Sequence, residues 1–203
     1  MTLRAFGLNC SLKGGDAPSS TQKLLDQLLH ALAAHGVEGD SVRVADHDVR
    51  PGVRADEGPG DAWPALRRRI LDADLLILAT PIWMGHPSSL AQRVLERMDA
   101  FLDEIDDDGV YPTFGRVALA AAVGNEDGAH KVTADLYQGL SDVGFTLPAG
   151  SPPYWVGEAM GSTDYLDLTQ TPQPLADTLA TIARNAAHLA GLLKAHPYPR
   201  PRR

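Results

Sequence analysis

The sequence predicts an α/β fold in which five parallel strands form one doubly wound sheet, in the order 2-1-3-4-5, between two layers of helices. The first observation is that short apolar segments alternate along the chain with segments whose apolar residues recur at helical spacing. The second is a pair of continuous apolar runs, at residues 75–79 and 117–123, which are typical of strands buried on both faces. The third is that polar or glycine-containing loops follow three of the strands, at the edge where such sheets bind ligands.

The N-terminal part of the chain supplies the first three strands. Residues 3–8 are expected to form the first strand, and leucines at helical spacing then predict a helix that ends at Gly36. Residues 42–45 are expected to form a short second strand near an edge of the sheet. The next segment, residues 46–60, contains prolines, glycines and charges, so we expect a long mobile loop. A helix at residues 62–71 then precedes the third strand.

The C-terminal part supplies the last two strands and the helices that cover them. A helix that starts near Pro87 has one apolar face, and its Arg93, Glu96 and Arg97 are expected to face solvent. An acidic turn at residues 103–109 follows this helix. The later elements are expected at residues 117–123 (fourth strand), 128–143 (helix), 145–147 (start of the last strand) and 172–195 (terminal helix).

Composition indicates a single domain at residues 1–195, followed by a disordered tail at 196–203 that alternates proline with arginine. A net charge of -8 argues against a nucleic acid or an anionic membrane as partner. No apolar run approaches the roughly 20 residues that span a bilayer, and the chain starts with a strand rather than a signal sequence, so we expect a cytoplasmic protein. The single cysteine, Cys10, cannot form an internal disulfide, which fits a reducing compartment.

The first of the three loops, residues 9–21, joins the first strand to the first helix. It contains hydroxyl side chains, glycines and the unpaired amides of a helix N-terminus, which together favour a phosphate group. Lys13 could add a full positive charge. The alternative is that Ser19 or Ser20 caps the helix and the glycines only form a turn.

Other phosphate-binding motifs do not match this loop. A Walker loop has its lysine after the second glycine, whereas Lys13 precedes Gly14, and no dinucleotide-binding G-x-G-x-x-G is present. Cys10 could suggest a phosphatase nucleophile, but Asp16 stands where such a loop places its phosphate-binding arginine. Cys10 is therefore interpreted as a small packing residue.

The second loop follows the third strand and suits a flat heterocycle. Thr80 and the backbone of residues 82–85 can form hydrogen bonds to the edge of a ring, and Trp83 or Met84 can pack beside it. The alternative is a hydrophobic plug at a helix start, with Pro87 as the first helical residue.

The third loop, residues 124–130, follows the fourth strand. Its glycines permit close approach of the backbone to a ligand, and Asn125 can donate and accept hydrogen bonds. Glu126 and Asp127 can instead complement the dipole of the next helix, and His130 in its first turn is more often a surface or capping residue than a catalyst. The seven histidines show no metal-ligand spacing.

Taken together, the loops resemble those of the flavodoxin-like NADPH-dependent FMN reductases, also called NAD(P)H-dependent oxidoreductases. The resemblance covers residues 3–145, and it departs from the family where residues 16–18 make the first loop acidic and stiff. The motifs that carry it are, in order, Ser11-x-Lys13, Ser20-Thr21-x-x-Leu24-Leu25, Thr80-Pro81-Ile82-Trp83 and Gly124-Asn125-Glu126-Asp127-Gly128-Ala129-His130.

The resemblance implies a flavodoxin-like fold, FMN bound without a covalent bond, and NADPH or NADH as electron donor. It implies no side chain as nucleophile or general base, and it implies a homodimer or homotetramer in which the exposed aromatic segments 83–84 and 152–155 take part. The implied cofactor-binding residues are Ser11, Lys13, Ser19, Ser20 and Thr21 for the phosphate, Pro81, Ile82, Trp83, Met84 and Gly85 for the ring, and Gly124, Asn125, Asp127, Gly128 and His130 for the other flank.

The activity implied by the resemblance is hydride transfer from the nicotinamide, by way of FMN, to a small-molecule electron acceptor: a quinone, a nitro or azo compound, or free flavin. The alternative from another class is a flavodoxin-type carrier that passes single electrons to a protein partner and has no NAD(P)H activity. A third alternative is a flavin-free interaction domain on the same fold.

Overall fold

The computed structural model describes residues 2–159 and 161–200. Its strands are β1 (Leu3–Asn9), β2 (Val37–Arg43), β3 (Leu75–Trp83), β5 (Val117–Gly124) and β6 (Tyr154–Val156), all parallel, in the order β2-β1-β3-β5-β6. A two-residue strand, β4 (His86–Pro87), pairs antiparallel with the end of β3. The predicted fold class and strand order are therefore confirmed, since β5 and β6 are the fourth and fifth strands of the parallel sheet.

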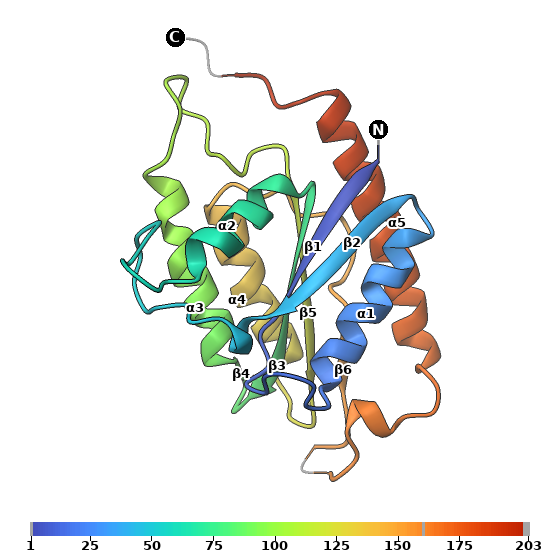
Figure 1. Cartoon of the computed structure of the whole chain (residues 1–203). Coiled ribbons are helices and arrows are strands. Elements are labelled where there is room, and N and C mark those ends of the chain that lie inside the picture. The colour runs from blue at the N-terminus through green and yellow to red at the C-terminus, as the bar shows by residue number, and fades with distance from the viewer. Residues whose placement is uncertain (1, 160, 201–203) are drawn as a thin grey trace.

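Helices cover both faces of this sheet (Figure 1). The helices α1 (Ser20–Ala33) and α5 (Gln173–Ala195) pack on one face, whereas α2 (Trp63–Asp72), α3 (Ser89–Met98) and α4 (Ala129–Asp142) pack on the other. Short 3-10 turns η1 (Val44–Asp46), η2 (Asp99–Leu102) and η3 (Tyr165–Asp167) lie in the connections. None of the helices that the structure describes is both long enough and apolar enough to cross a bilayer.

The central strands divide their side chains between the two layers of helices. Leu75 and Ile77 of β3 face α1 and α5, whereas Leu76 and Leu78 face the opposite layer. This alternation follows from the two-residue period of a strand, and it explains why the run at residues 75–79 is continuously apolar. The small alanines of β5 let the flanking helices pack close to the centre of the sheet.

Two strand predictions are corrected by the structure. The second strand starts at Val37, earlier than expected, and residues 44–46 form η1. Most of β2 is exposed or half-exposed, so an edge strand of this kind carries no apolar run that would reveal it. The last strand is interrupted: Thr146 forms only an isolated bridge to Val117, and the paired segment is β6. Prolines and a glycine in the intervening residues 148–153 prevent continuous pairing.

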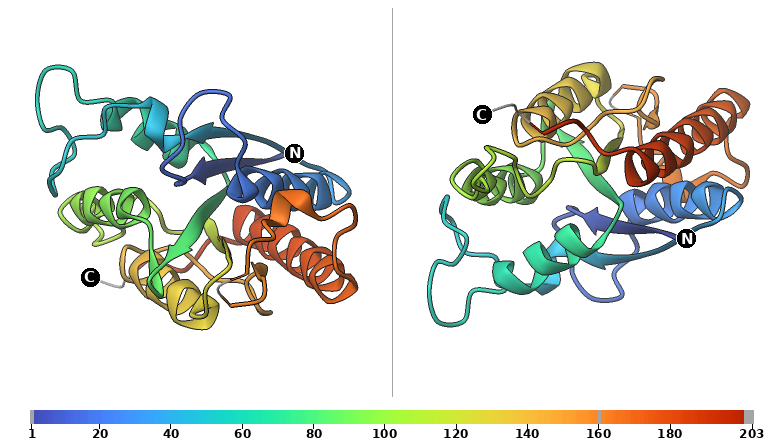
Figure 2. Two further views of the ribbon diagram at one scale, coloured as in Figure 1. Left: turned by 90° about the horizontal axis from the view of Figure 1, so that it is seen from below. Right: turned by 90° about the horizontal axis from the view of Figure 1, so that it is seen from above.

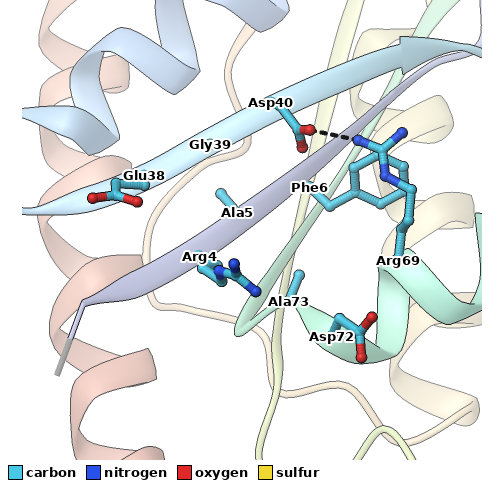
Figure 3. Close-up of a pocket in the computed structure, with 9 residues that line it drawn as sticks. All are labelled: Arg4, Ala5, Phe6, Glu38, Gly39, Asp40, Arg69, Asp72 and Ala73. Carbon is cyan, nitrogen blue, oxygen red and sulfur yellow. Dashed lines mark hydrogen bonds and ion pairs between the residues drawn. The ribbon is translucent and has the colours of Figure 1, made fainter.

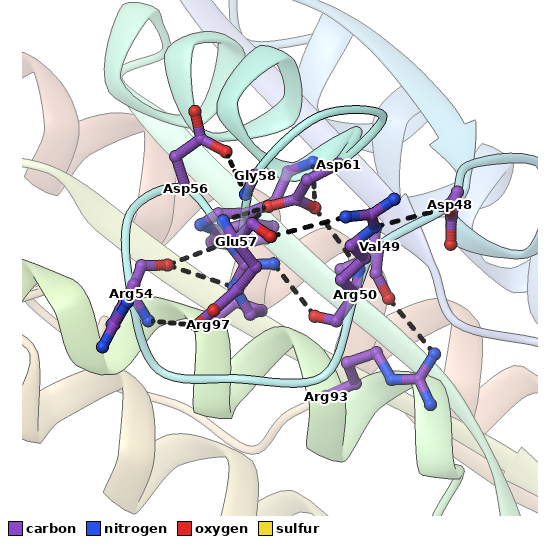
Figure 4. A network of polar contacts seen from close by, with 11 residues as sticks. Asp48, Val49, Arg50, Arg54, Asp56, Glu57, Gly58, Asp61, Arg93 and Arg97 are labelled. Carbon is purple, nitrogen blue, oxygen red and sulfur yellow. Dashed lines mark hydrogen bonds and ion pairs between the residues drawn. The ribbon is translucent and has the colours of Figure 1, made fainter.

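The third helix also differs from the prediction. It begins at Ser89 with Ser88 as its cap, and Pro87 belongs to β4. Arg97, which was expected to face solvent, is fully buried, and Arg93 is half-buried. The cause is the segment at residues 46–60, which folds across this face of α3 (Figure 4).

Arg97 fixes that segment in place. Its guanidinium donates hydrogen bonds to the carbonyl oxygens of Arg50 (2.9 Å) and Arg54 (2.8 Å) and to Oδ2 of Asp61 (2.7 Å). The segment is irregular, as predicted, but Figure 4 shows that it is tied to α3 by this network.

Residues 196–200 form no helix or strand, and Tyr198 shares a hydrogen bond of 2.9 Å with the hydroxyl of Thr146. Residues 201–203 of the predicted tail lie outside the described part of the chain. The boundary of the domain at residue 195 and the disorder of the tail stay predictions.

Candidate functional site

A cavity of about 250 Å³ opens at the carboxyl edge of the sheet, which faces the viewer in the left panel of Figure 2. The loops after β1, β3 and β5 and the segment after β6 form its walls. The lining residues are Ser11, Leu12, Lys13, Ser19, Ser20, Thr21, Pro81, Ile82, Trp83, Val123, Gly124, Asn125, Glu126, Trp155, Asp164 and Tyr165. The three predicted loops therefore meet at one cavity, as expected for the carboxyl ends of parallel strands.

The loop between β1 and α1 is shaped by Asn9, which is fully buried. Its Oδ1 accepts a hydrogen bond from the backbone amide of Ser11 (2.9 Å), and its Nδ2 donates one to Oε1 of Gln22 (2.8 Å). Ser19 caps α1 by accepting a hydrogen bond from the amide of Gln22 (3.2 Å), so the capping alternative for this serine is confirmed. The cap does not remove the anion site, because the earlier amides of the first helical turn have no acceptor within the helix.

Beneath the loops lies a chain of buried hydrogen bonds. The hydroxyl of Ser88 donates to the carbonyl oxygen of Cys10 (2.6 Å), and the amide of Ser88 donates to the hydroxyl of Thr80 (2.9 Å). Thr80 is fully buried, and its hydroxyl both accepts the hydrogen bond from Ser88 and donates one to the carbonyl oxygen of Pro81. The expectation that this hydroxyl forms a hydrogen bond to a ligand is therefore wrong. Its role is to join the first loop to the second.

The second loop is a tight hairpin between β3 and β4. Met84 and Gly85 occupy its two central positions with φ of 52° and 72°, the left-handed backbone that such hairpins require. Trp83 lines the cavity and is 52% exposed, whereas Met84 is 86% exposed and lies outside it. Of the residues predicted for the ring, Pro81, Ile82 and Trp83 line the cavity, and Met84 and Gly85 do not.

The third loop contributes less than predicted. Gly124 and Asn125 line the cavity, but Asp127 accepts a hydrogen bond from the amide of the following glycine (2.7 Å) and His130 pairs with the hydroxyl of Tyr154 (3.1 Å). Gly128 is needed for a different contact, because a Cβ at this position would lie 3.0 Å from Cα of Gly85. Asp127, Gly128 and His130 are therefore not brought to the cavity, since they form the start of α4 and its contact with the hairpin.

Several lining residues were missed by the sequence analysis. Trp155 was assigned to an exposed aromatic surface, but it is half-buried and contacts Tyr165 with ring centroids 5.3 Å apart. Asp164 and Tyr165 lie at the start of the short turn η3, which has no periodic signal in the sequence. The other missed residues are Leu12, Val123 and Glu126, each adjacent to a predicted one.

The charged residues that line the cavity come from different loops. Lys13 lies in the first loop, and its ammonium donates to the carbonyl oxygen of Pro18 (3.4 Å). Glu126 and Asp164 lie with Asn125, whose amide donates to Oδ1 of Asp164 (3.3 Å). A ligand with an anionic group at one end and hydroxyl donors further along fits this distribution.

Cys10 does not reach this cavity. Burial raises the pKa of its thiol well above the usual range, so it stays protonated. The interpretation of Cys10 as a packing residue is thereby supported. Among the described residues, no group of three histidine, cysteine or carboxylate side chains is arranged to hold a metal ion.

A second cavity, of about 370 Å³, lies beside β1, β2 and α2 (Figure 3). Arg69 pairs there with Asp40 (2.5 Å) and covers the ring of Phe6 at 4.1 Å. This second cavity lies along the body of the strands, away from the loops at their carboxyl ends. Its charged side chains, of both signs, are exposed at the open edge of the sheet. We therefore assign function to the cavity at the carboxyl edge.

Comparison with known proteins gives the family of the chain. Residues 3–161 match the sequence profile described as NADPH-dependent FMN reductase. The chain is 32% identical over 209 residues to 8-demethyl-8-aminoriboflavin-5'-phosphate synthase of Streptomyces davaonensis, covering 98% of this chain and 81% of that protein. It is also 35% identical over 207 residues to a Mycobacterium bovis protein described as divalent metal cation transporter MntH, but it spans only 30% of that protein's length.

Solved structures of flavin-related proteins are also similar to this chain. The structure of RosB with the bound intermediate 8-demethyl-8-formylriboflavin-5'-phosphate superimposes with a TM-score of 0.87 at 31% identity, covering 97% of this chain and 82% of RosB. The NADH:FMN oxidoreductase EMOB superimposes with a TM-score of 0.67 at 22% identity, covering 98% and 94% of the two chains, which shows the shared fold.

Proposed function

The chain belongs to the NADPH-dependent FMN reductase family, and we propose that it binds FMN in the cavity at the carboxyl edge and acts as an NAD(P)H oxidoreductase toward a small-molecule acceptor. When bound, FMN supplies the hydride chemistry, accepting hydride from the nicotinamide and passing electrons to a quinone, a nitro or azo compound, or free flavin. The observation that carries the proposal is that three loops at strand ends meet around one cavity. The first of these loops leads into the N-terminus of α1, which also lines the cavity.

The first helical turn fits the phosphate of FMN. Thr21 is only 3% exposed and lines the cavity, and the amides at the start of α1 point along the helix axis toward its N-terminal end. The hydroxyl groups of Ser11 and Thr21 and the ammonium of Lys13 complete a set of donors for a dianion. Asn9 and Ser19 hold this turn in shape by accepting hydrogen bonds from the amides of Ser11 and Gln22. The hydroxyl of Ser11 and the ammonium of Lys13, which donate to the carbonyl oxygens of Lys13 (3.3 Å) and Pro18 (3.4 Å), would exchange these acceptors for the phosphate.

The remaining walls fit the ribityl chain and the ring. Asn125 and Asp164 offer an amide and a carboxylate to hydroxyl groups, and Trp83 with Pro81 offers an apolar surface to a flat heterocycle. The cavity of about 250 Å³ is slightly smaller than most small-molecule sites, which hold roughly 300–1,000 Å³. The ligand would therefore extend past the half-exposed Trp83 toward solvent, where a second substrate can reach it.

In the proposed reaction, the residues of the cavity bind and orient the flavin. The backbone of residues 81–83 is fixed by the pairing of β3 with β5 and by the hairpin, and that of Gly124 by the pairing of β5 with β6. These dipoles therefore need no rearrangement when negative charge develops on the ligand. No side chain of the cavity is required to act as a nucleophile.

Anaerobic titration of the FMN-loaded protein with NADPH and with NADH tests the proposal, with visible absorption as the readout. We expect the flavin band to bleach in one two-electron step and to return when a quinone is added. A flavin that binds but is reduced only by dithionite, in two separate one-electron steps, would identify a carrier. A protein that binds no flavin would identify an interaction domain.

A second candidate function is favoured by the match to RosB and to the Streptomyces davaonensis synthase. In this alternative the flavin 5'-phosphate is the substrate, and the protein modifies its ring. Mass spectrometry of flavin extracted after incubation with FMN in air, with and without a mixture of amino acids as amine donors, separates the two functions. Unchanged FMN supports the oxidoreductase, and a new flavin mass supports the modifying enzyme.

We further propose that the protein assembles as a homodimer or homotetramer in the cytoplasm. Leu12, Trp83 and Met84 leave an exposed apolar rim beside the cavity, which suits a contact with a second subunit. Light scattering that reports a monomer at micromolar concentration would remove this part of the proposal.

A further inference from the structure

One wall of the cavity is formed by a segment that we call the strap, residues 161–171, which runs from β6 toward α5 and includes η3 (Figure 1). Its Asp164 and Tyr165 line the cavity, and Tyr165 supports Trp155, which also lines it. Figure 2 shows the strap, in orange, against the N-terminal end of α1. The strap contains only a single short 3-10 turn, so its position depends on contacts with other elements.

The main contact is made by Lys23, in the second turn of α1. Its ammonium donates hydrogen bonds to the carbonyl oxygens of Tyr165 (2.9 Å), Leu166 (3.4 Å) and Leu168 (2.8 Å). It also lies 4.8 Å from the centre of the Tyr165 ring. A lysine has three N–H donors, and all three are used on one short stretch of backbone.

Neighbouring residues of α1 form further hydrogen bonds to the strap. Gln27 accepts a hydrogen bond from the hydroxyl of Tyr165 (2.5 Å) and donates one to the hydroxyl of Thr171 (2.8 Å). Ser20, in the turn assigned to the phosphate, accepts one from the amide of Leu166 (3.3 Å). The turn that would hold the phosphate and the strap are therefore joined by a continuous set of hydrogen bonds.

We propose that Lys23 is a positioning residue that holds the strap on α1 and thereby sets the affinity of the cavity for the whole flavin, an inference that rests on the proposed function. Lys23 is not among the residues that line the cavity, so it acts through the strap rather than on the ligand. Without it, three carbonyl oxygens of the strap lose their donor together, and on the side of α1 the segment that carries Asp164 and Tyr165 keeps only the hydrogen bonds of Gln27 and Ser20.

The test compares FMN and riboflavin binding in the wild type and in Lys23→Met, which keeps the length of the side chain and removes its donors. Because the proposed function assigns Asp164 of the strap to the ribityl chain, which both ligands share, we expect both affinities to fall by a similar factor, about tenfold. Hydrogen exchange of residues 161–168 should become faster in the free variant, and FMN should no longer protect them as strongly as in the wild type. Lys23→Arg, which retains several donors, should restore most of the affinity.

Lys194→Met is the matched control, because Lys194 also joins two elements, α5 and the residue Asp74 before β3, but at the opposite edge of the sheet (2.9 Å). It should leave both affinities unchanged. If Lys23→Met does not fold, Gln27→Met removes the other ties to Tyr165 and Thr171 and should weaken both ligands in the same proportion.

Three outcomes overturn the inference. Unchanged affinities in Lys23→Met would show that the strap needs no clamp, and a loss for FMN alone would show that Lys23 acts as a charge on the phosphate. Unchanged exchange of residues 161–168 would exclude the strap as the intermediary. Failure of the wild type to bind either flavin would instead reject the proposed function, so the two failures are distinguishable.

Discussion

The guanidinium of Arg97 and the carboxylate of Asp61 form an ion pair of 2.7 Å, and neither side chain is exposed to solvent. Burial alone would raise the pKa of Asp61, but the hydrogen bond from Arg97 and those from the amides of Glu57, Trp63 and Arg50 hold it well below the usual range. The pair joins α3 to the end of the long segment at residues 46–60 (Figure 4).

Removing one partner of this pair should destabilise the protein strongly. In Arg97→Met we expect the free energy of unfolding to fall by about 3–5 kcal/mol, because the buried carboxylate of Asp61 is left without its counter-charge. Chemical denaturation monitored by far-UV circular dichroism measures this loss. Arg93→Met, which removes a single half-buried contact to the carbonyl oxygen of Val49, should cost much less.

The same pair predicts a dependence of stability on pH. Because the pKa of Asp61 is lower in the folded state, its contribution is present above the unfolded pKa of about 3.9 and is lost as the pH falls below it toward the folded value. The difference in unfolding free energy between the wild type and Asp61→Asn should therefore begin to narrow at about pH 5 and narrow further as the pH falls below about 3.9. Asp135→Asn, at an exposed ion pair, should show no comparable narrowing.

Thr21→Val tests the assignment of the phosphate. The hydroxyl of Thr21 lies in the first turn of α1 and lines the cavity, so its loss should weaken FMN by about 1–3 kcal/mol and riboflavin far less. Titration of flavin fluorescence measures both affinities. Thr178→Val, which removes a hydroxyl bonded within α5, is the control. Equal losses for the two ligands would contradict the assignment.

Trp83 and Met84 are adjacent exposed residues with different expected roles. Trp83→Ala should weaken FMN and riboflavin alike by about 1 kcal/mol or more, because it removes apolar surface from the cavity. Met84→Ala should leave both affinities nearly unchanged, since Met84 lies outside the cavity. The contrast between the two variants is measured in the same titration, and equal effects would place the ring elsewhere.

Met84 also offers a gain in stability. A methionine with φ of 52° is held in a left-handed backbone conformation that asparagine adopts more easily, and asparagine followed by glycine is the favoured pair in such hairpins. Met84→Asn should raise the unfolding free energy by about 1 kcal/mol. Thermal unfolding of Met84→Asn against Met84→Ala checks this, because alanine keeps the unfavourable conformation and should bring no gain.

The sequence was sufficient for the fold, and the three predicted loops meet at one cavity, while the binding of a cofactor there stays a prediction. Continuous apolar runs identified β3 and β5, and the rule that parallel strands end at one edge brought Thr21, Trp83 and Asn125 to one cavity. Within the third loop, Asp127 and His130 do not line the cavity and have their partners in the start of α4 and in β6. A sequence motif shows which residues follow a strand, but it does not show which of them form hydrogen bonds within or beside the next helix instead of lining the cavity.

Contacts between distant segments were beyond the reach of periodicity. The burial of Arg97 depends on a loop far earlier in the chain, and the position of Tyr165 depends on Lys23 in α1. Helical spacing describes the faces of one helix, and it cannot reveal that an irregular segment covers a charged face. The structure adds these long-range contacts, those of Arg97 and of Lys23, to what the sequence predicts.

Cys10 has a consequence for the chemical durability of the protein. Its thiol is the single one in the chain, it lies fully buried beside the carbonyl oxygen of Leu8 (3.9 Å), and burial keeps it protonated. Reactive quinones and the peroxide that forms when reduced flavins meet oxygen attack exposed thiolates. The folded protein offers them none, so alkylating and oxidising agents that inactivate many other enzymes through cysteine should spare this one until it unfolds.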